Sequence, residues 1–381
     1  MIKRTIENNA SLNMWGYSKI SPNFKYKERI NKTIDCTYGI CNIFDTFLSP
    51  KDQQVYIIYS NKIEMSININ IYIYSVQKKE VCQKLTPNYH AKELRLLKYF
   101  TNKSKKKEYI ISTDWDGLLS TWFFGQNNTF ILKYKINTYQ TDIYSCLIIF
   151  KTDINIKIVD DYLIFGCESI SEDEQACTKI HALGKGNFIN NIPFTNREKI
   201  RNLLMWYNNK NKQNYLICLA MDKILIINFL QNKKEKEIIT NEKNTYNCGI
   251  IYNEKIDKIN EKYFLCCTSS TGHVLVFDLE EGTKTCDIIL RPNLHRVYDI
   301  LPWNEKYFIV ADTLDNGYDV FEFRIGGKIV VISSIGGLDE DDIECIRKIN
   351  HPEYGECILT ASHKNCIKIF ENIASNFKIS F

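Results

Sequence analysis

Fourteen cysteines and six histidines are the residues of this chain best suited to metal chemistry. A zinc site needs paired ligands at short spacing, such as two Cys-x2-Cys pairs. The nearest approach is Cys36-x4-Cys41; no second pair matches it, and the histidines are scattered along the chain. Seven cysteines lie inside apolar stretches, where a thiol acts as a small buried hydrophobic group: Cys146, Cys167, Cys218, Cys266, Cys267, Cys357 and Cys366. We expect neither a metal site nor a cofactor.

Acidic side chains offer a second kind of chemistry. The run Asp339–Asp342, followed by Glu344, could supply two carboxylates to a hydrolase. Its simpler interpretation is a solvated loop, which could also dock a basic peptide. No Gly-x-Ser-x-Gly, glycine-rich phosphate loop or His-Glu-x-x-His motif occurs. The sequence therefore favours a protein that is not an enzyme.

Basic residues could bind nucleic acid. Two lysine-rich runs occur, Lys103–Lys107 and Lys233–Lys236, but the net charge of the chain is only +4. Binding to single strands also needs exposed aromatic side chains among the lysines, whereas the tyrosines and phenylalanines here lie in apolar runs typical of strands. We expect no nucleic-acid partner and interpret the lysines as solubilising loops and sheet edges.

The elements that position these residues follow from an internal repeat. An aromatic residue followed by two aliphatic ones recurs six times, and a seventh copy begins with cysteine; the copies begin at Tyr56, Tyr109, Tyr162, Tyr215, Tyr263, Tyr307 and Cys357. The intervals are 53, 53, 53, 48, 44 and 50 residues. A unit of four short strands needs about 40–50 residues. The chain therefore has the period of a propeller.

Turn signals divide each unit into strands. Asp114–Gly117, Ser269–Gly272 and Asp315–Gly317 each follow one copy of the repeat and precede an alternating run that ends in an aromatic residue. Glycine and asparagine adopt the positive φ of tight hairpins, so we predict hairpins here. A fourth strand is predicted at Thr129–Ile136 and at three equivalent segments: Lys284–Leu290, Lys328–Ser333 and Asn376–Phe381.

The segment before each hairpin is ambiguous. Apolar residues recur there three residues apart, as in Ile343 and Ile346, and this spacing alone would indicate a helix. These segments are short, rich in β-branched and aromatic residues, and lie just before a hairpin. We therefore predict strands, which brings each unit to four.

Four of the seven units, the second, fifth, sixth and seventh, resemble WD40 repeats in their residues. Lys262–Thr283 contains Gly272-His-Val-Leu-Val-Phe-Asp278, where the terminal Trp-Asp of the family has become Phe-Asp. Ser112–Phe124, with Trp122, and Glu356–Asn372, with Phe370, are similar. The usual Gly-His pair is missing, and the His–Ser/Thr–Asp–Trp hydrogen-bond set of the family cannot be assembled in full. The resemblance implies an all-β, seven-bladed β-propeller of four-stranded antiparallel blades. Only 16 glycines are present, too few for the glycine pairs of kelch blades.

The expected organisation is a loosely ordered segment over residues 1–23 and a single propeller over residues 24–381. Either Phe24–Ile34 or Asn376–Phe381 could supply the last outer strand. No secretory signal opens the chain, and no apolar run approaches the length of about 18 residues that spans a membrane. We expect a cytoplasmic or nuclear protein.

The resemblance also implies a function, since propellers of this family commonly present a rim to partner proteins. Aligning the innermost strands on their apolar spacing places five candidate partner-binding residues at one position: Arg95, Tyr144, Arg201, Tyr298 and Glu344. Tyrosine and arginine are enriched at interface hot spots, although packing between blades is an equally good interpretation. The predicted function is a protein-interaction scaffold. Its alternatives are a propeller hydrolase and a phosphoinositide-binding propeller, the latter because Phe323-Arg-Ile-Gly326 resembles the Phe-Arg-Arg-Gly motif but lacks its second arginine.

Overall fold

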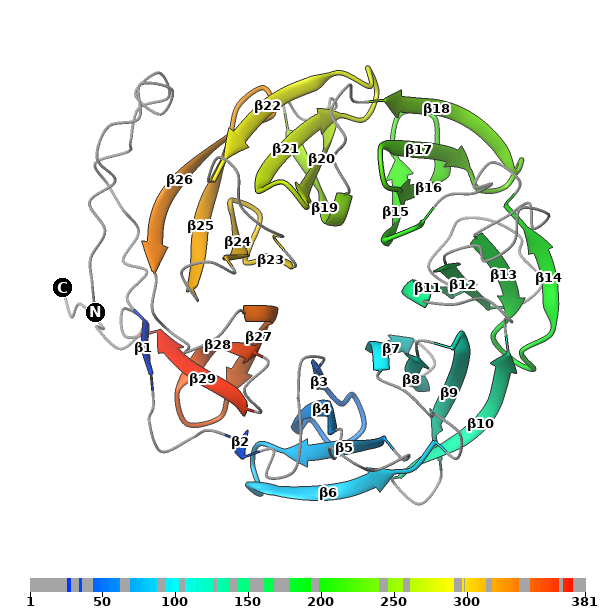
Figure 1. Cartoon of the computed structure of the whole chain (residues 1–381), viewed down its shortest axis with the longest axis vertical. Helices are drawn as coiled ribbons and strands as arrows, with labels where there is room; N and C mark the ends of the chain where they lie inside the picture. Colours follow the sequence, from blue (N-terminus) through cyan, green and yellow to red (C-terminus); the bar gives the residue numbers. More distant parts are fainter. Residues whose placement is uncertain are drawn as a thin grey trace. The chain divides into compact units, whose positions relative to one another are not determined.

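Twenty-nine β-strands account for the regular structure that the computed structural model describes (Figure 1). The described residues are 26–28, 34–35, 44–61, 69–87, 94–102, 107–114, 116–125, 129–137, 143–150, 161–167, 178–192, 199–239, 246–255, 261–290, 297, 299–312, 317–335, 343–362 and 366–372. The two terminal segments predicted from the sequence, residues 1–23 and Asn376–Phe381, lie outside these ranges.

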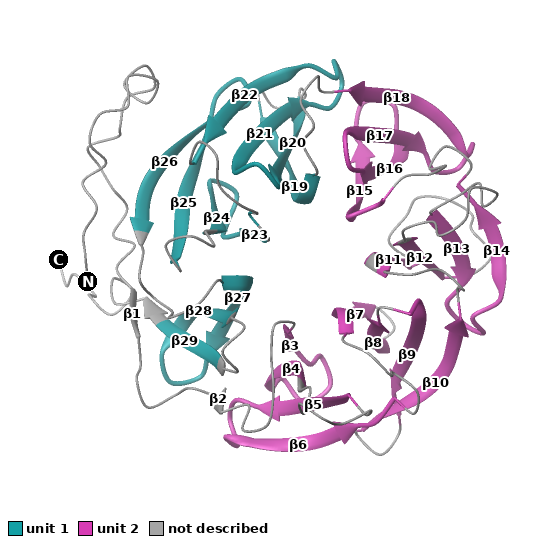
Figure 2. Ribbon diagram, in the orientation of Figure 1, with its two compact units in different colours: residues 1–37, 244–381 teal, residues 38–243 magenta. Residues whose placement is uncertain are grey.

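The strands form two compact units, coloured separately in Figure 2. The unit Tyr38–Lys243 contains four sheets, and the unit of Met1–Thr37 with Asn244–Phe381 contains three. Each sheet is antiparallel. In six sheets four consecutive strands pair in order, and in the seventh β27, β28 and β29 pair in order while β1 and β2 pair with β29. The fold is therefore the all-β, seven-bladed β-propeller that the sequence predicts.

The unit Tyr38–Lys243 holds blades 1 to 4. Blade 1 is β3 (Phe44–Leu48), β4 (Val55–Asn61), β5 (Asn70–Ser75) and β6 (Glu80–Leu85). Blade 2 is β7 (Leu94–Asn102), β8 (Lys107–Asp114), β9 (Leu118–Phe124) and β10 (Phe130–Asn137). Blade 3 is β11 (Ile143–Ile149), β12 (Tyr162–Cys167), β13 (Thr178–Ala182) and β14 (Phe188–Asn191). Blade 4 is β15 (Asn202–Asn208), β16 (Gln213–Leu219), β17 (Lys223–Asn228) and β18 (Lys233–Ile239).

The other unit holds blades 5 to 7. Blade 5 is β19 (Tyr246–Lys255), β20 (Glu261–Ser269), β21 (His273–Asp278) and β22 (Lys284–Ile289). Blade 6 is β23 (Ile300–Pro302), β24 (Tyr307–Asp312), β25 (Gly317–Arg324) and β26 (Lys328–Ile335). Blade 7 is β27 (Ile343–His351), β28 (Gly355–Ser362) and β29 (Cys366–Asn372); β1 (Tyr26–Glu28) and β2 (Ile34–Asp35) both pair with β29 at its outer edge. The outer strand of blade 7 thus comes from the N-terminal segment.

The repeat found in the sequence marks the second strand of every blade. In four blades the aromatic residue thirteen or fourteen positions downstream lies directly opposite that strand, in the pairs Ile110–Trp122, Leu265–Phe277, Phe308–Phe321 and Ile358–Phe370. The predicted hairpin register is therefore confirmed in blades 2, 5, 6 and 7.

Two hairpin turns share the same hydrogen bonds. In blade 2 Asp114 Oδ1 accepts the N–H groups of Asp116 and Leu118, and in blade 5 Ser269 Oγ accepts those of Thr271 and His273. The glycines between them, Gly117 and Gly272, have φ angles of 78° and 79°. A side chain at either position would strain the backbone, so the turn chemistry read from the sequence specifies these hairpins.

A β-bulge explains the three-residue apolar spacing. In blade 2 Leu94 faces Asp114 and Leu96 faces Thr113, so one extra residue stands between them. Leu94 and Leu97 then pack in the core between blades 1 and 2, while Leu96 packs between blades 2 and 3. In a regular strand, residues three apart face opposite sides. The inserted residue places both on one side, which gives a strand the spacing of a helix.

In four further blades, two apolar residues with this three-residue spacing pack in the same core. They are Ile143 with Cys146, Ile200 with Leu203, Val297 with Ile300, and Ile343 with Ile346. All four segments contain a strand, although β15 begins two residues after Ile200 and β23 spans only Ile300–Pro302.

Side chains of the outer strands hold neighbouring blades together. The Gln83 amide bonds to both the N–H and the C=O of Phe130, at 2.8 and 2.6 Å. The Tyr134 hydroxyl donates to Leu183 O at 3.0 Å, and Thr285 Oγ1 donates to Gly327 O at 2.9 Å. Of the hydrogen-bond set typical of WD40 blades, the described residues show one bond, from Trp122 Nε1 to Ser112 Oγ at 3.2 Å. Blade docking therefore depends on these outer contacts and on the apolar cores.

Candidate functional site

The candidate partner-binding residues lie at the bulges. Arg95 in β7, Tyr144 in β11 and Glu344 in β27 are each the extra residue at the start of the innermost strand of a blade. Each stands between two apolar or small residues that are buried, for example Leu94 and Leu96 beside Arg95. A bulge re-aims the inserted side chain. The position chosen from sequence alignment is therefore structurally equivalent in these three blades.

Arg201 occupies the same place just before β15. Its N–H donates to Leu219 O at 2.9 Å, and Asn202 also pairs with Leu219, so two residues again oppose one. Ile200 before it and Leu203 after it are buried in the core between blades 3 and 4, while Arg201 itself is half-buried. In the unit Tyr38–Lys243, the strands β7, β11 and β15 are neighbours, and their bulges carry Arg95, Tyr144 and Arg201. We call these three residues the bulge row.

The other unit has a different set at this position. Tyr298 and the acidic run Asp339–Asp342 lie outside the described residues. In β19 the extra residue falls at Asn247–Cys248, and Asn247 Nδ2 donates to Val297 O at 2.9 Å. This hydrogen bond joins blades 5 and 6, so in blade 5 the position contributes to packing between blades, the other interpretation given from the sequence. Glu344 is half-buried.

The residue types of the bulge row are ones that commonly bind partners. A guanidinium group can form two parallel hydrogen bonds with a carboxylate or phosphate, and a phenol ring combines apolar area with one polar end. Among the described residues, no group of three or more histidine, cysteine, aspartate or glutamate side chains could hold a metal ion. The thiols of Cys146 and Cys218 are buried, and burial raises the pKa of each to about 12, so neither is a nucleophile at neutral pH.

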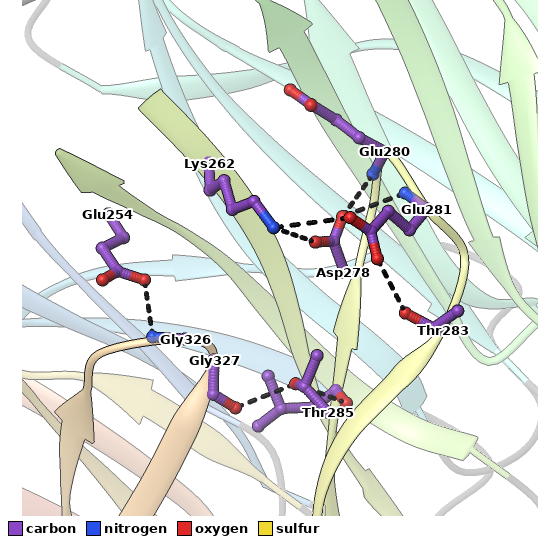
Figure 3. Close-up of polar contacts among 10 residues, drawn as sticks. Glu254, Lys262, Asp278, Glu280, Glu281, Thr283, Thr285, Gly326 and Gly327 are labelled. Atoms are coloured by element: carbon purple, nitrogen blue, oxygen red, sulfur yellow. Dashed lines mark hydrogen bonds and ion pairs between the residues drawn. The ribbon is translucent and has the colours of Figure 1, made fainter. Parts of the chain in front are cut away.

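Polar residues that the sequence reasoning missed form separate groups of contacts in blades 5 and 6 (Figure 3). Asp278, the last residue of the Phe-Asp pair, accepts the N–H groups of Glu280 and Glu281 at 2.9 and 3.0 Å. Lys262 Nζ lies 3.2 Å from Asp278 Oδ2 and 3.5 Å from Glu281 Oε1. The hydrogen bond to Asp278 raises the pKa of Lys262. Asp278 thus shapes the β21–β22 turn, and only its place after an aromatic residue signalled this role.

The segment Phe323–Gly326 ends strand β25 and enters the β25–β26 turn. Glu254 Oε2 accepts the Gly326 N–H at 2.9 Å, as Figure 3 shows. Arg324 forms an ion pair with the buried Glu322, which also binds Lys306 Nζ at 2.7 Å. The single arginine of this segment is thus engaged within its own blade.

Comparison with known proteins leaves the fold as the main guide to function. No protein-family model matches this chain, and no curated protein is found to be similar to it. In the described part of the chain no helix is long and apolar enough to cross a membrane. The class that the structure defines is a seven-bladed β-propeller, a fold that is compatible with a protein-interaction scaffold.

Proposed function

We propose that this protein is a non-catalytic scaffold of the cytoplasm or nucleus, a divergent WD40-like propeller that binds partner proteins through the bulge row. The observation that carries the proposal is the repeated bulge at the start of the innermost strands. A polar or aromatic residue stands there in blade after blade, between neighbours that are buried.

Charge reversal within the bulge row tests this proposal. The double variant Arg95→Glu and Arg201→Glu changes two half-buried side chains, and the matched control Lys78→Glu with Lys210→Glu makes the same charge change at exposed turns of the same unit. Proteins captured by the wild type and by the control should be lost from the bulge-row variant, while all three melt at similar temperatures. Equal recovery by all three would refute the assignment of the bulge row.

No described observation favours the two alternatives. The carboxylates that a hydrolase would need, Asp339–Asp342, lie outside the described residues, and Arg324 already binds Glu322. Incubation with panels of esters and glycosides tests the first alternative directly. Turnover that a carboxylate substitution abolishes would replace the scaffold proposal with an enzymatic one.

A further inference from the structure

Glu108 is a carboxyl group with an unusual environment at the seam between blades 1 and 2. Its side chain is fully buried at the start of β8. Two hydroxyl groups contact it: Tyr99 OH, 2.9 Å from Oε2, and Ser49 Oγ, 3.3 Å from Oε1. Among the described residues no lysine or arginine forms an ion pair with it. Buried carboxylates are normally paired with a cation because burial in a medium of low polarity disfavours charge.

The surrounding groups come from both blades. Ser49, Lys51 and Asp52 lie in the β3–β4 turn of blade 1, while Tyr99 comes from β7 of blade 2. The Lys51 ammonium group stands 4.1 Å above the Phe124 ring. Asp52 accepts the Tyr56 hydroxyl at 2.6 Å. The turn thus places one cation, Lys51, and one anion, Asp52, near enough to act on the charge of Glu108, besides the hydroxyl groups that Glu108 contacts.

Burial raises the pKa of Glu108, and Asp52 adds to the rise. The hydrogen bonds from Tyr99 and Ser49 and the charge of Lys51 oppose it but do not cancel it. Because the folded state holds the proton more tightly than the unfolded state, this group stabilises the fold fully below its ordinary pKa. That stability is lost as the pH rises through the raised value.

Tyr99 also contacts β3, the strand that leads into this turn. Its ring stacks on Phe47 with centroids 4.0 Å apart and 8° between planes, and its backbone N–H donates to Asp45 Oδ2 at 2.9 Å. The β3–β4 turn is closed by Gln53 N to Ser49 O at 2.9 Å and by Ser49 N to Gln54 O at 3.0 Å. Leu48, next to Ser49, exposes 55% of its surface. Glu108 thus contacts the turn that directly follows Leu48, an apolar residue that the end of β3 presents to solvent.

We propose that Glu108, Tyr99 and Ser49 form a proton-linked latch that holds the β3–β4 turn of blade 1 against blade 2. With its carboxyl group protonated, Glu108 is neutral, donates to Ser49 and accepts from Tyr99, so the seam is closed. When the proton leaves to solvent, a buried charge remains with two hydroxyl donors, and the turn opens more often to let water reach it. The latch makes the presentation of Leu48 dependent on pH.

Hydrogen exchange of two amides on the full-length chain tests the latch. The N–H groups of Gln53 and Ser49 report opening of the turn, after correction for the intrinsic pH dependence of exchange. Their opening constants should rise with pH by up to about tenfold for each unit by which the pKa of Glu108 is raised. The equivalent turn of blade 4, reported by Lys212 N bonded to Asn208 O at 2.9 Å, contains no such carboxyl group and should not respond.

Variants assign the response to Glu108. Glu108→Gln keeps the size and the hydrogen bonds but cannot ionise, so its Gln53 and Ser49 amides should lose the pH dependence. The matched control Glu237→Gln alters an ion-paired glutamate of the same unit and should keep it. Tyr99→Phe removes a hydrogen-bond donor to the Glu108 carboxylate, so the transition should move to higher pH. If Glu108→Gln does not fold, this variant still tests whether Glu108 causes the pH dependence. A wild type without pH dependence, an unchanged response in Glu108→Gln, or an unmoved transition in Tyr99→Phe would overturn the proposal.

Discussion

The contact between Gln83 and Phe130 offers a direct measure of what joins neighbouring blades. Gln83 lies in β6, the outer strand of blade 1, and its amide bonds to both backbone groups of Phe130 at the start of β10. Phe130 is 3% exposed, so water does not readily reach the groups that Gln83 serves. Truncation to alanine removes both partners at once.

The expected loss follows from these two bonds. Leaving a buried donor or acceptor unsatisfied costs about 1–3 kcal/mol. In the alanine variant, water that enters the space left by the Gln83 side chain can bond to Phe130 and reduce this cost. We therefore expect Gln83→Ala to destabilise the protein by about 2–3 kcal/mol. Gln83→Glu retains the acceptor for Phe130 N–H but sets a carboxylate against Phe130 O, so it should be no more stable than the alanine variant.

Urea unfolding followed by circular dichroism measures this effect as a shift of the midpoint at unchanged slope. Glu80→Ala, an exposed position in the same strand, is the matched control and should change stability by less than about 0.5 kcal/mol. If Gln83→Ala behaves like the control, outer-strand side chains do not hold the blades together, and the apolar cores alone must do so.

Two further predictions concern turn geometry and pH. Lys212 adopts a φ of 58°, where the equivalent turn residue of blade 7 is Gly355 with a φ of 72°, so Lys212→Gly should stabilise the protein by about 1 kcal/mol in the same urea assay; a loss of stability would contradict this. His181 packs between Phe165 and Phe188 and bonds through Nδ1 to Gly186 O at 2.9 Å, and burial lowers its pKa. The neutral ring is favoured in the fold, so stability should fall as the pH drops below about 6.5, the ordinary value, towards the lowered one. His181→Gln should flatten that part of the stability curve between pH 7 and pH 5, and an unchanged slope would show that other groups cause it.

The architecture was predictable because its signals are local. Strand-forming runs, hairpin turns with Gly117 and Gly272, and a period near 50 residues are all written within short segments. Propeller blades repeat the same local structure, so each unit reinforces the prediction made from the others. The alignment of innermost strands even placed Arg95, Tyr144 and Glu344 at one position, since the apolar spacing around them records the bulge.

The candidate site was predictable only in part. Alignment found which residues share a position but not what each contacts, and Asn247 turned out to bind Val297 O of the next blade. Glu108 carries no signal in the sequence, because its burial depends on a turn of another blade, in which its partner Ser49 lies 59 residues away. Its burial could be learned only from the packed seam.

The sequence by itself therefore determined the strands, their hairpin register and the number of blades, since turn residues and apolar periodicity act over a few neighbours along the chain. Tertiary structure alone decided the rest. It showed that the N-terminal strands β1 and β2 pair with β29, and that a helix-like spacing marks a bulged strand. It also placed the carboxyl group of Glu108 in a buried seam, where it contacts two hydroxyl groups. Such features depend on which distant segments meet, and the energies of burial and charge that govern them arise only after those segments are in contact.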